Sequence, residues 1–138
     1  MPSSATGCRA RVVLVEDGRL ALIRRVRGGS TYHLFPGGGV HDGESPEQAA
    51  AREAHEELGV DVEVGRLLHE ELFAGERFLY FEARIVGGSF GTGEGDEIRT
   101  SGTTASGTYD PVWVPLTELA GLDVRPRELA ERLLGSAA

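Results

Sequence analysis

The chain has 138 residues, 40% of them hydrophobic and 26% charged, which is the composition of one soluble globular domain. Its formal net charge of −8 argues against broad binding to nucleic acid polymers, which requires a basic surface. A single nucleotide remains open, because a bound divalent cation can invert the local charge. All 14 basic residues are arginine, so neither a Schiff-base lysine nor a Walker-type lysine is available.

The features of the sequence that report on location favour a cytoplasmic protein. No apolar run reaches the roughly 18 residues that a membrane span requires, and the N-terminus lacks the basic and apolar blocks of a secretory signal. Cys8 is the only cysteine, which excludes an internal disulfide and suits a reducing compartment. We expect one domain over residues 1–138, monomeric or homodimeric, with residues 1–8 as a flexible tail.

A β-hairpin is predicted at the start of the domain. Arg9 to Glu16 and Arg19 to Val26 are rich in β-branched and apolar residues, and Asp17-Gly18 between them is a turn signal. Three arginines cluster where the second strand ends: Arg24, Arg25 and Arg27. They are either solvated charges or, since the guanidinium fork suits phosphate oxygens, a binding site for a phosphate.

A short aromatic segment from Tyr32 to Phe35 ends at Pro36 and leads into three consecutive glycines, Gly37 to Gly39. Glycines let the backbone approach a ligand closely, so this run is predicted to be a loop beside a binding site. The run matches neither the dinucleotide-binding pattern nor the P-loop pattern, and taken alone it is equally consistent with an ordinary loop.

The clearest local signals mark a helix from Pro46 to Leu58. Ser45 is a good N-cap and forms an S-x-x-Q capping box with Gln48, and proline suits the first helical position. Gly59 stands where a C-terminal glycine is expected. Because both ends are marked, the direction of each side chain follows from the step of about 100° per residue.

An acidic stripe runs along this helix, because Glu53, Glu56 and Glu57 share one arc about 100° wide. A separate face, suited to packing on a sheet, is formed by Ala50, Ala51, Ala54 and Leu58. Like charges at this spacing repel one another, and oxygen ligands without cysteine or paired histidine favour a hard cation, Mg²⁺ or Mn²⁺. The alternative is a solvated acidic face. His55 points away from the acidic arc and is expected to be solvated or packed.

The second half of the chain is predicted to hold three more strands. They are Asp61 to Leu72 with a break at Gly65-Arg66, Arg77 to Val86, and Tyr109 to Pro115. In Arg77 to Val86, Phe78 and Tyr80 face one side, and the other side is formed by Leu79, Phe81, Ala83 and Ile85.

The connections complete an α/β pattern. Gly87 to Gly107 is a long loop, mobile or functional, with acidic residues at Glu94, Asp96 and Glu97. Thr117 is a candidate cap for a helical turn, and Pro126 to Leu134 is an amphipathic helix. Strands on both sides of a central helix, with a second helix at the end, imply a mixed sheet between helices.

The segment from Gly38 to Val60 has a further pattern. Its chemistry-bearing positions are Gly38, Glu44, Arg52, Glu53, Glu56, Glu57 and Gly59, followed by the aliphatic Val60. In this spacing the segment resembles the Nudix box in full, a match expected by chance at roughly 10⁻⁸ per window when each residue type has about 7% usage. The departure is Ala54, where the family usually has a larger aliphatic residue. The FPGGG lead-in, the YDPVW strand and the closing helix also resemble small bacterial Nudix proteins, so the resemblance covers most of the chain.

The resemblance implies a Nudix fold, an α/β/α sandwich around a mixed sheet, and Mg²⁺-dependent hydrolysis of a nucleoside diphosphate linked to another group, with Mn²⁺ able to substitute. By motif position, the implied metal ligands are Glu53, Glu56, Glu57 and the backbone carbonyl of Gly37 or Gly38. Arg52 would orient the glutamates, with Glu44 as its partner just outside the helix. The metal would polarise the phosphate and lower the pKa of an attacking water.

The resemblance leaves the general base and the substrate open. Family members take the base from a box glutamate or from the later loop, where Glu97 is the first candidate and Glu94 the second. The downstream signatures of NADH, coenzyme A, ADP-ribose and dinucleoside polyphosphate enzymes are not cleanly placed, which leaves a mutator-type nucleoside triphosphate pyrophosphohydrolase by elimination. An ADP-ribose or sugar-nucleotide pyrophosphatase is the alternative. The candidate substrate-binding residues are Arg24, Arg25, Tyr32 and Phe78.

Two hypotheses from other classes compete with an enzyme acting on a free nucleotide. A non-catalytic nucleotide sensor usually loses box glutamates, and none is lost in this chain. A purely structural acidic helix requires the match to the box to be a coincidence. The expected partner is therefore a small-molecule nucleotide, with neither a nucleic acid polymer nor a membrane.

Overall fold

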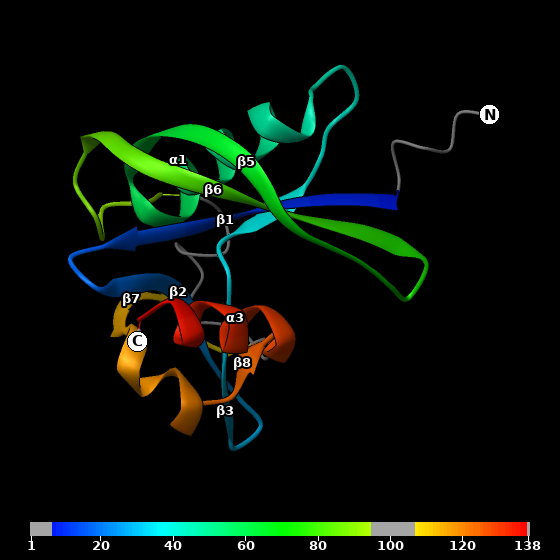
Figure 1. The fold of residues 1–138 in the computed structure, drawn as a ribbon. Coiled ribbons are helices and arrows are strands. Elements are labelled where there is room, and N and C mark those ends of the chain that lie inside the picture. Colours follow the sequence, from blue (N-terminus) through cyan, green and yellow to red (C-terminus); the bar gives the residue numbers. More distant parts are fainter. Residues whose placement is uncertain (1–6, 95–106, 138) are drawn as a thin grey trace.

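The computed structural model describes residues 7–94 and 107–137 and has an α/β fold (Figure 1). In chain order its elements are β1 (Cys8–Glu16), β2 (Arg19–Arg27), β3 (Ser30–Leu34), β4 (Gly37–Gly39), α1 (Pro46–Leu58), β5 (Val60–Phe73), β6 (Glu76–Gly88), β7 (Asp110–Pro115), the 3-10 helix η2 (Leu116–Gly121), β8 (Val124–Arg125) and α3 (Arg127–Ala137). Most of the expected tail lies outside the described residues, but Cys8 already belongs to β1.

The strands form one mixed sheet in the order β5-β6-β1-β2-β3-β8, with β4 added to β1 and β7 added to β2. The β1–β6 and β3–β8 pairs are parallel, and the other pairs are antiparallel. The predicted turn is confirmed, since Asp17 and Gly18 have φ values of 54° and 75°. The hairpin pairs only next to this turn, through Val15↔Leu20 and Glu16↔Arg19, because β1 continues along β6 while β2 continues along β3 and β7.

Helices cover the two faces of this sheet, which confirms the expected α/β/α sandwich (Figure 1). Alternate residues of each strand point to opposite faces. On β6, Leu79 and Phe81 pack in the core under α1, while Tyr80 and Phe78 pack in the core under α3, as their alternation predicts. The second core also contains Leu129 and Ala130 of α3 and Leu119 of η2, so the C-terminal elements close the far side of the domain.

The predicted helix is found as α1 with the expected bounds and caps. The Ser45 hydroxyl accepts a hydrogen bond from the Gln48 N–H at 3.0 Å, and the Gln48 side chain accepts one from the Ser45 N–H at 2.8 Å. Gly59 adopts a left-handed φ of 81° and donates its N–H to the His55 carbonyl. Of the predicted packing face, Ala50, Ala54 and Leu58 are fully buried, whereas Ala51 is only half-buried, and Ala49 takes part in the core instead. This close packing fixes the side on which the glutamates lie.

Three local features differ from what the sequence predicts. Gly37 to Gly39 forms a short strand instead of a loop. The expected break at Gly65-Arg66 is a register irregularity within the long β5. The 3-10 helix η2 begins directly after Pro115, so Thr117 is not its cap. No helix in residues 7–94 and 107–137 is long and apolar enough to cross a membrane.

Candidate active site

The glycine strand β4 allows helix α1 to approach the sheet edge closely. It runs antiparallel to β1, with Gly38 opposite Ala10 and Gly37 opposite Arg11. A Cβ atom added to Gly38 would lie only 2.5 Å from Oε2 of Glu53. The close approach that the structure shows is therefore between the backbone of a strand and a carboxylate of the helix, whereas the predicted approach to a ligand stays a prediction.

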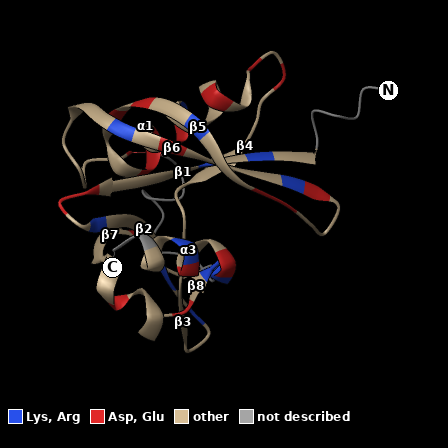
Figure 2. Cartoon of the chain, viewed as in Figure 1, with Lys and Arg blue, Asp and Glu red and all other residues tan. Residues whose placement is uncertain are grey.

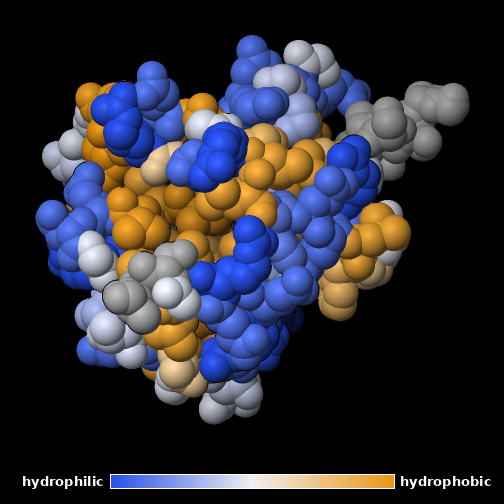
Figure 3. Space-filling model, viewed as in Figure 1, coloured by the Kyte–Doolittle hydropathy of each residue, from blue (hydrophilic) through white to orange (hydrophobic). Residues whose placement is uncertain are grey.

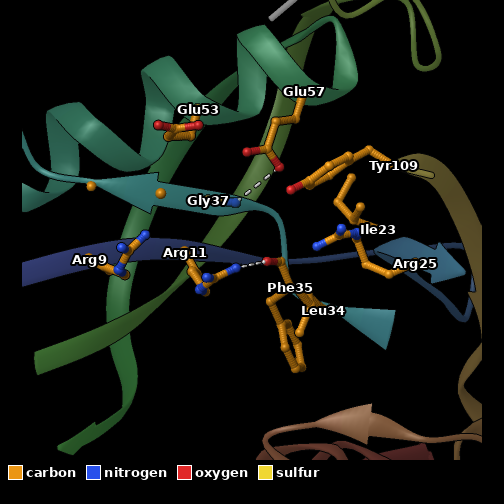
Figure 4. Close-up of a pocket in the computed structure, with 12 residues that line it drawn as sticks. Arg9, Arg11, Ile23, Arg25, Leu34, Phe35, Gly37, Glu53, Glu57 and Tyr109 are labelled. Atoms are coloured by element: carbon orange, nitrogen blue, oxygen red, sulfur yellow. Dashed lines mark hydrogen bonds between the residues drawn. The ribbon is translucent and has the colours of Figure 1, made fainter. Parts of the chain in front are cut away.

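The three glutamates of the acidic stripe differ in exposure. Glu53 and Glu57 are buried, whereas the Glu56 side chain is 41% exposed. Glu57 Oε1 accepts a hydrogen bond from the Gly37 N–H at 3.3 Å, so both buried carboxylates lie against β4 (Figure 4). Two carboxylates held at the edge of a cleft in this way form a strongly negative wall.

Arg52 binds the carboxylates together. Its guanidinium donates to both oxygens of Glu44, at 2.8 and 3.1 Å, which confirms the contact predicted between these two residues. The Arg52 guanidinium also donates to Glu53 Oε2 at 3.1 Å, to Glu56 Oε1 at 3.3 Å and to the Gly39 carbonyl at 2.9 Å. The bidentate bond from Arg52, with a further bond from the His41 N–H, lowers the pKa of Glu44 to about 2. The same bond raises the pKa of Arg52, so both charges persist over the physiological range.

This donor set fits a hard divalent cation. The guanidinium of Arg52 is shared by Glu44, Glu53 and Glu56, and Glu57 lies beside them against β4, so the ligand atoms of all four side chains are oxygen. Within the described residues no group of three acidic, histidine or cysteine side chains already converges to hold an ion, and Arg52 binds two of the three predicted ligands, Glu53 and Glu56. Glu53, Glu56 and Glu57 remain the predicted ligands. The Gly39 carbonyl is occupied by Arg52, whereas the carbonyls of Gly37 and Gly38 stay predicted ligands.

Arginines line the opposite side of the same cleft, which has a volume of about 200 Å³. Arg9 and Arg11 reach it from β1, on the side of β4 away from Glu53, and Arg25 reaches it from β2 (Figure 4). Each is held in place: Arg9 pairs with Glu76 at 2.8 Å, and Arg11 donates to the Phe35 carbonyl at 2.7 Å. Arg25 is buried, donates to the Thr108 carbonyl at 2.8 Å and lies 3.7 Å from the Tyr109 ring centroid. In Figure 2 the acidic residues of α1 are red and the basic residues of β1 are blue.

The predicted substrate-binding residues lie in three different places. Arg25 lines the cleft, and Tyr32 lies beside it, 5.8 Å from the Arg25 guanidinium. Arg24 does not line the cleft, because neighbouring strand residues point to opposite faces; it pairs with Asp110 at 3.7 Å instead. Phe78 lies in an adjoining apolar pocket, with the Arg11 guanidinium 5.6 Å from its ring centroid.

The cleft also contains residues that the sequence did not single out, namely Arg9, Arg11 and Tyr109. The Arg-x-Arg spacing in an otherwise apolar strand was an available signal, since residues two apart share a face. Tyr109 had no such signal, because its position against Arg25 depends on contact between distant parts of the chain.

The two loop candidates for the general base cannot be compared directly. Glu97 lies outside the described residues. Glu94 is exposed, at the end of a segment that packs on the C-terminal turn of α1. In that segment Gly91 donates its N–H to the Leu58 carbonyl at 2.8 Å, and a Cβ atom on Gly93 would lie 2.5 Å from the Glu56 carbonyl. The segment therefore leaves the helix next to the acidic stripe.

Comparison with known proteins places the cleft in a family context. A MutT-like protein of Streptomyces ambofaciens is 43% identical over 81 residues, which are 57% of this chain and 51% of that protein. An RNA pyrophosphohydrolase of Cellvibrio japonicus is 46% identical over 66 residues, which are 44% of this chain and 38% of that protein. The chain thus spans about half or less of the length of these curated relatives.

The fold is shared along almost the whole chain. The crystal structure of an ADP-ribose pyrophosphatase from Streptococcus suis superimposes with a TM-score of 0.66 at 17% identity, covering 95% of this chain and 91% of that one. The NUDIX domain family matches residues 7–133, which include the capped helix, the glycine strand and both walls of the cleft. Since this match covers nearly all of the chain, the protein belongs to the Nudix family.

Proposed function

We propose that the protein is a Mg²⁺-dependent pyrophosphohydrolase that cleaves a nucleoside diphosphate linked to a further group, with a nucleoside triphosphate as the first candidate substrate. The observation that supports this most is the pairing of two opposite walls across β4. Buried carboxylates of α1 form one wall, and Arg9, Arg11 and Arg25 form the other. A chain of phosphates bound to a divalent cation has the matching charge pattern, with cation and anion a few ångströms apart.

Different residues of the cleft bind the phosphates and the metal. The arginines bind phosphate oxygens, and their fixed contacts with Glu76, Phe35 and Thr108 hold them ready for the substrate. Glu53, Glu56 and Glu57 would hold Mg²⁺, for which Mn²⁺ can substitute; when bound, the metal polarises the phosphate and acidifies water. Arg52, itself oriented by Glu44, positions the glutamates.

A carboxylate must accept the proton of the attacking water. We assign this role first to Glu97 and second to Glu94, with a glutamate of α1 as the remaining alternative. The segment that leads to them supports this choice, because it crosses the last turn of α1 beside Glu56. To separate these candidates, each candidate glutamate is replaced by glutamine and kcat is measured as a function of pH. The plateau of kcat on the basic side of the profile should be lost in the variant that lacks the general base and kept in the others.

The similar proteins support a nucleotide substrate but differ in the substrate that their names give. A MutT-like protein and an RNA pyrophosphohydrolase are similar in sequence, and an ADP-ribose pyrophosphatase is similar in fold. The second candidate is therefore an ADP-ribose or sugar-nucleotide substrate. A non-catalytic nucleotide sensor is the weaker alternative, because all carboxylates of the site are retained. We expect the substrate to be a free nucleotide. We expect the protein to act in the cytoplasm, because a single cysteine suits a reducing compartment.

A substrate panel tests the proposal. Nucleoside and deoxynucleoside triphosphates, ADP-ribose, sugar nucleotides and dinucleoside polyphosphates are incubated with the protein and Mg²⁺, and the products are separated by chromatography. Release of pyrophosphate and a nucleoside monophosphate supports a triphosphate substrate, whereas two monophosphates support the diphosphate-linked class. Binding without turnover over a full range of Mg²⁺ and Mn²⁺ concentrations would point to a sensor and contradict the proposal.

A further inference from the structure

A second pocket adjoins the cleft on the face of the sheet opposite α1. Its volume is about 370 Å³, and its walls include Phe73, Phe78 and Tyr80 of the β5–β6 hairpin. Arg11 and Leu34 line both this pocket and the cleft, so the two spaces meet at the Arg11 side chain. A ligand whose phosphates contact Arg11 therefore has an aromatic pocket within reach of its next group.

The aromatic rings are arranged for contact with a flat group. Phe73 and Phe78 meet edge to face at 6.2 Å, and Arg11 lies over the Phe78 ring at 5.6 Å. Phe73 is 67% exposed at the tip of the β5–β6 hairpin, where Figure 3 shows a hydrophobic projection. An aromatic side chain that stays exposed beside a phosphate-binding cleft is well placed to stack on a nucleobase.

Glu71 is the one acidic residue that lines this pocket within the described part of the chain. Its orientation is set by His69, whose side chain is only 8% exposed. His69 Nε2 lies 3.2 Å from Glu71 Oε1, and Arg132, which can only donate, lies 3.4 Å from His69 Nδ1, an arrangement that favours the tautomer with its proton on Nε2, facing Glu71. Among the described residues Glu71 Oε2 has no hydrogen-bond partner, which leaves an acceptor in the pocket.

From this arrangement we infer that the pocket binds the base of the substrate and selects guanine, with Glu71 as the residue that determines specificity; the inference rests on the proposed function and names its substrate class. A carboxylate accepts hydrogen bonds and cannot donate them. Guanine alone among the common bases presents two adjacent donors, the N1–H and the 2-amino group, that match the free Oε2 of Glu71 and the second lone pair of its Oε1. Adenine and cytosine place an acceptor beside their amino group, and uracil flanks its N–H with two carbonyls, so each brings a lone pair against the carboxylate.

A basic residue on a different strand of the same pocket supplies the complementary group. Arg125 lines it and is held by Asp123 through bonds of 3.1 and 3.0 Å. Its guanidinium also lies 4.3 Å from the Tyr32 ring centroid, which limits its movement. Arginine is the usual partner of the O6 and N7 acceptors of guanine. The pocket thus offers an acceptor on β5 and a donor on β8, the two kinds of group that a guanine requires.

Calorimetric titration with nucleoside monophosphates tests the inference without depending on turnover, because GMP, AMP, CMP and UMP contain no phosphoric anhydride bond. In the presence of Mg²⁺, GMP should bind about tenfold or more tightly than the other three. Glu71→Gln replaces one acceptor by a donor and should reduce GMP affinity to the level of AMP, while the affinity for AMP stays unchanged and reports an intact pocket.

Glu70→Gln is the matched control. Glu70 is the adjacent residue on the opposite face of β5 and pairs with Arg77 at 2.8 Å, so its replacement should leave the preference for GMP as it is. Equal affinity for all four monophosphates, or a guanine preference that survives Glu71→Gln, would overturn the inference. Hydrolysis of all four triphosphates with equal kcat/KM would overturn it while leaving the proposed function standing. Selective binding of GMP with no hydrolysis of any nucleotide would support the pocket and overturn the proposed function instead.

Discussion

Replacing Gly38 by alanine tests whether the glycine strand positions the glutamates of α1. The added Cβ atom would lie 2.5 Å from Oε2 of Glu53 and 2.8 Å from its carboxyl carbon. Non-bonded heavy atoms require about 3.5 Å. The Glu53 carboxylate must therefore move by roughly 1 Å, and displacements of this size at a catalytic group cost about 100-fold in rate.

The same change should affect folding little. Gly38 lies in an extended strand without a left-handed φ, so alanine is compatible with its backbone. Alanine at such a site stabilises by about 0.4–1 kcal/mol through the unfolded chain, which offsets part of the cost of moving Glu53. We expect the free energy of unfolding to change by about 1 kcal/mol or less in either direction.

The assay compares kcat/KM for nucleotide hydrolysis with Mg²⁺ and the urea-unfolding midpoint for Gly38→Ala and Gly39→Ala. Gly39 is the next residue of the same strand, and a Cβ atom there would meet nothing within 4 Å. Gly39→Ala should therefore lose much less activity than Gly38→Ala at similar stability. Wild-type kcat/KM in Gly38→Ala, or equal losses in both variants, would refute the role assigned to the glycine strand.

Two further predictions concern Arg52 and its partner. Arg52→Lys keeps the charge but loses the planar fork that reaches Glu44, Glu53 and the Gly39 carbonyl together, so it should lower stability by about 1–3 kcal/mol and kcat/KM by tenfold or more. Unchanged urea unfolding and kinetics would contradict this. The pKa of Glu44 falls from 4.5 to about 2 on folding, so its contribution to stability is complete above pH 4.5 and is lost as the pH falls toward 2. The free energy of unfolding should consequently decline less over this acid range in Glu44→Gln than in the wild type, and parallel curves would contradict the assignment.

The part of the site that could be predicted from sequence is the part determined locally. The bounds of α1 follow from Ser45, Gln48 and Gly59, whose interactions span only a few residues. The common direction of the glutamates then follows from helix geometry alone. The contact between Glu44 and Arg52 was predictable for the same reason, because Glu44 directly precedes the N-cap Ser45 and Arg52 lies eight residues after Glu44, within the helix.

The remaining features depend on contacts between distant segments. Glycines have low intrinsic preference for strands, and Gly37 to Gly39 pair as a strand only because β1 lies beside them. The wall of arginines arises from the divergence of β1 and β2 beyond their turn, which the hairpin sequence does not encode. The contact of Arg25 with Tyr109 joins residues far apart in the chain and required the closed fold.

The measurement that tests the central claim most directly is the Mg²⁺-dependent hydrolysis rate of Glu57→Gln. Glutamine has nearly the same shape, and its carbonyl oxygen can still accept the bond from the Gly37 N–H, so the fold should be kept while the charge for the cation is lost. Glu47→Gln, an exposed replacement in the first turn of the same helix, is the matched control. We predict that kcat/KM falls by more than roughly 100-fold in Glu57→Gln and is retained in Glu47→Gln. Hydrolysis by Glu57→Gln at the wild-type rate with Mg²⁺ would contradict the assignment of this helix as the metal-binding wall of the active site.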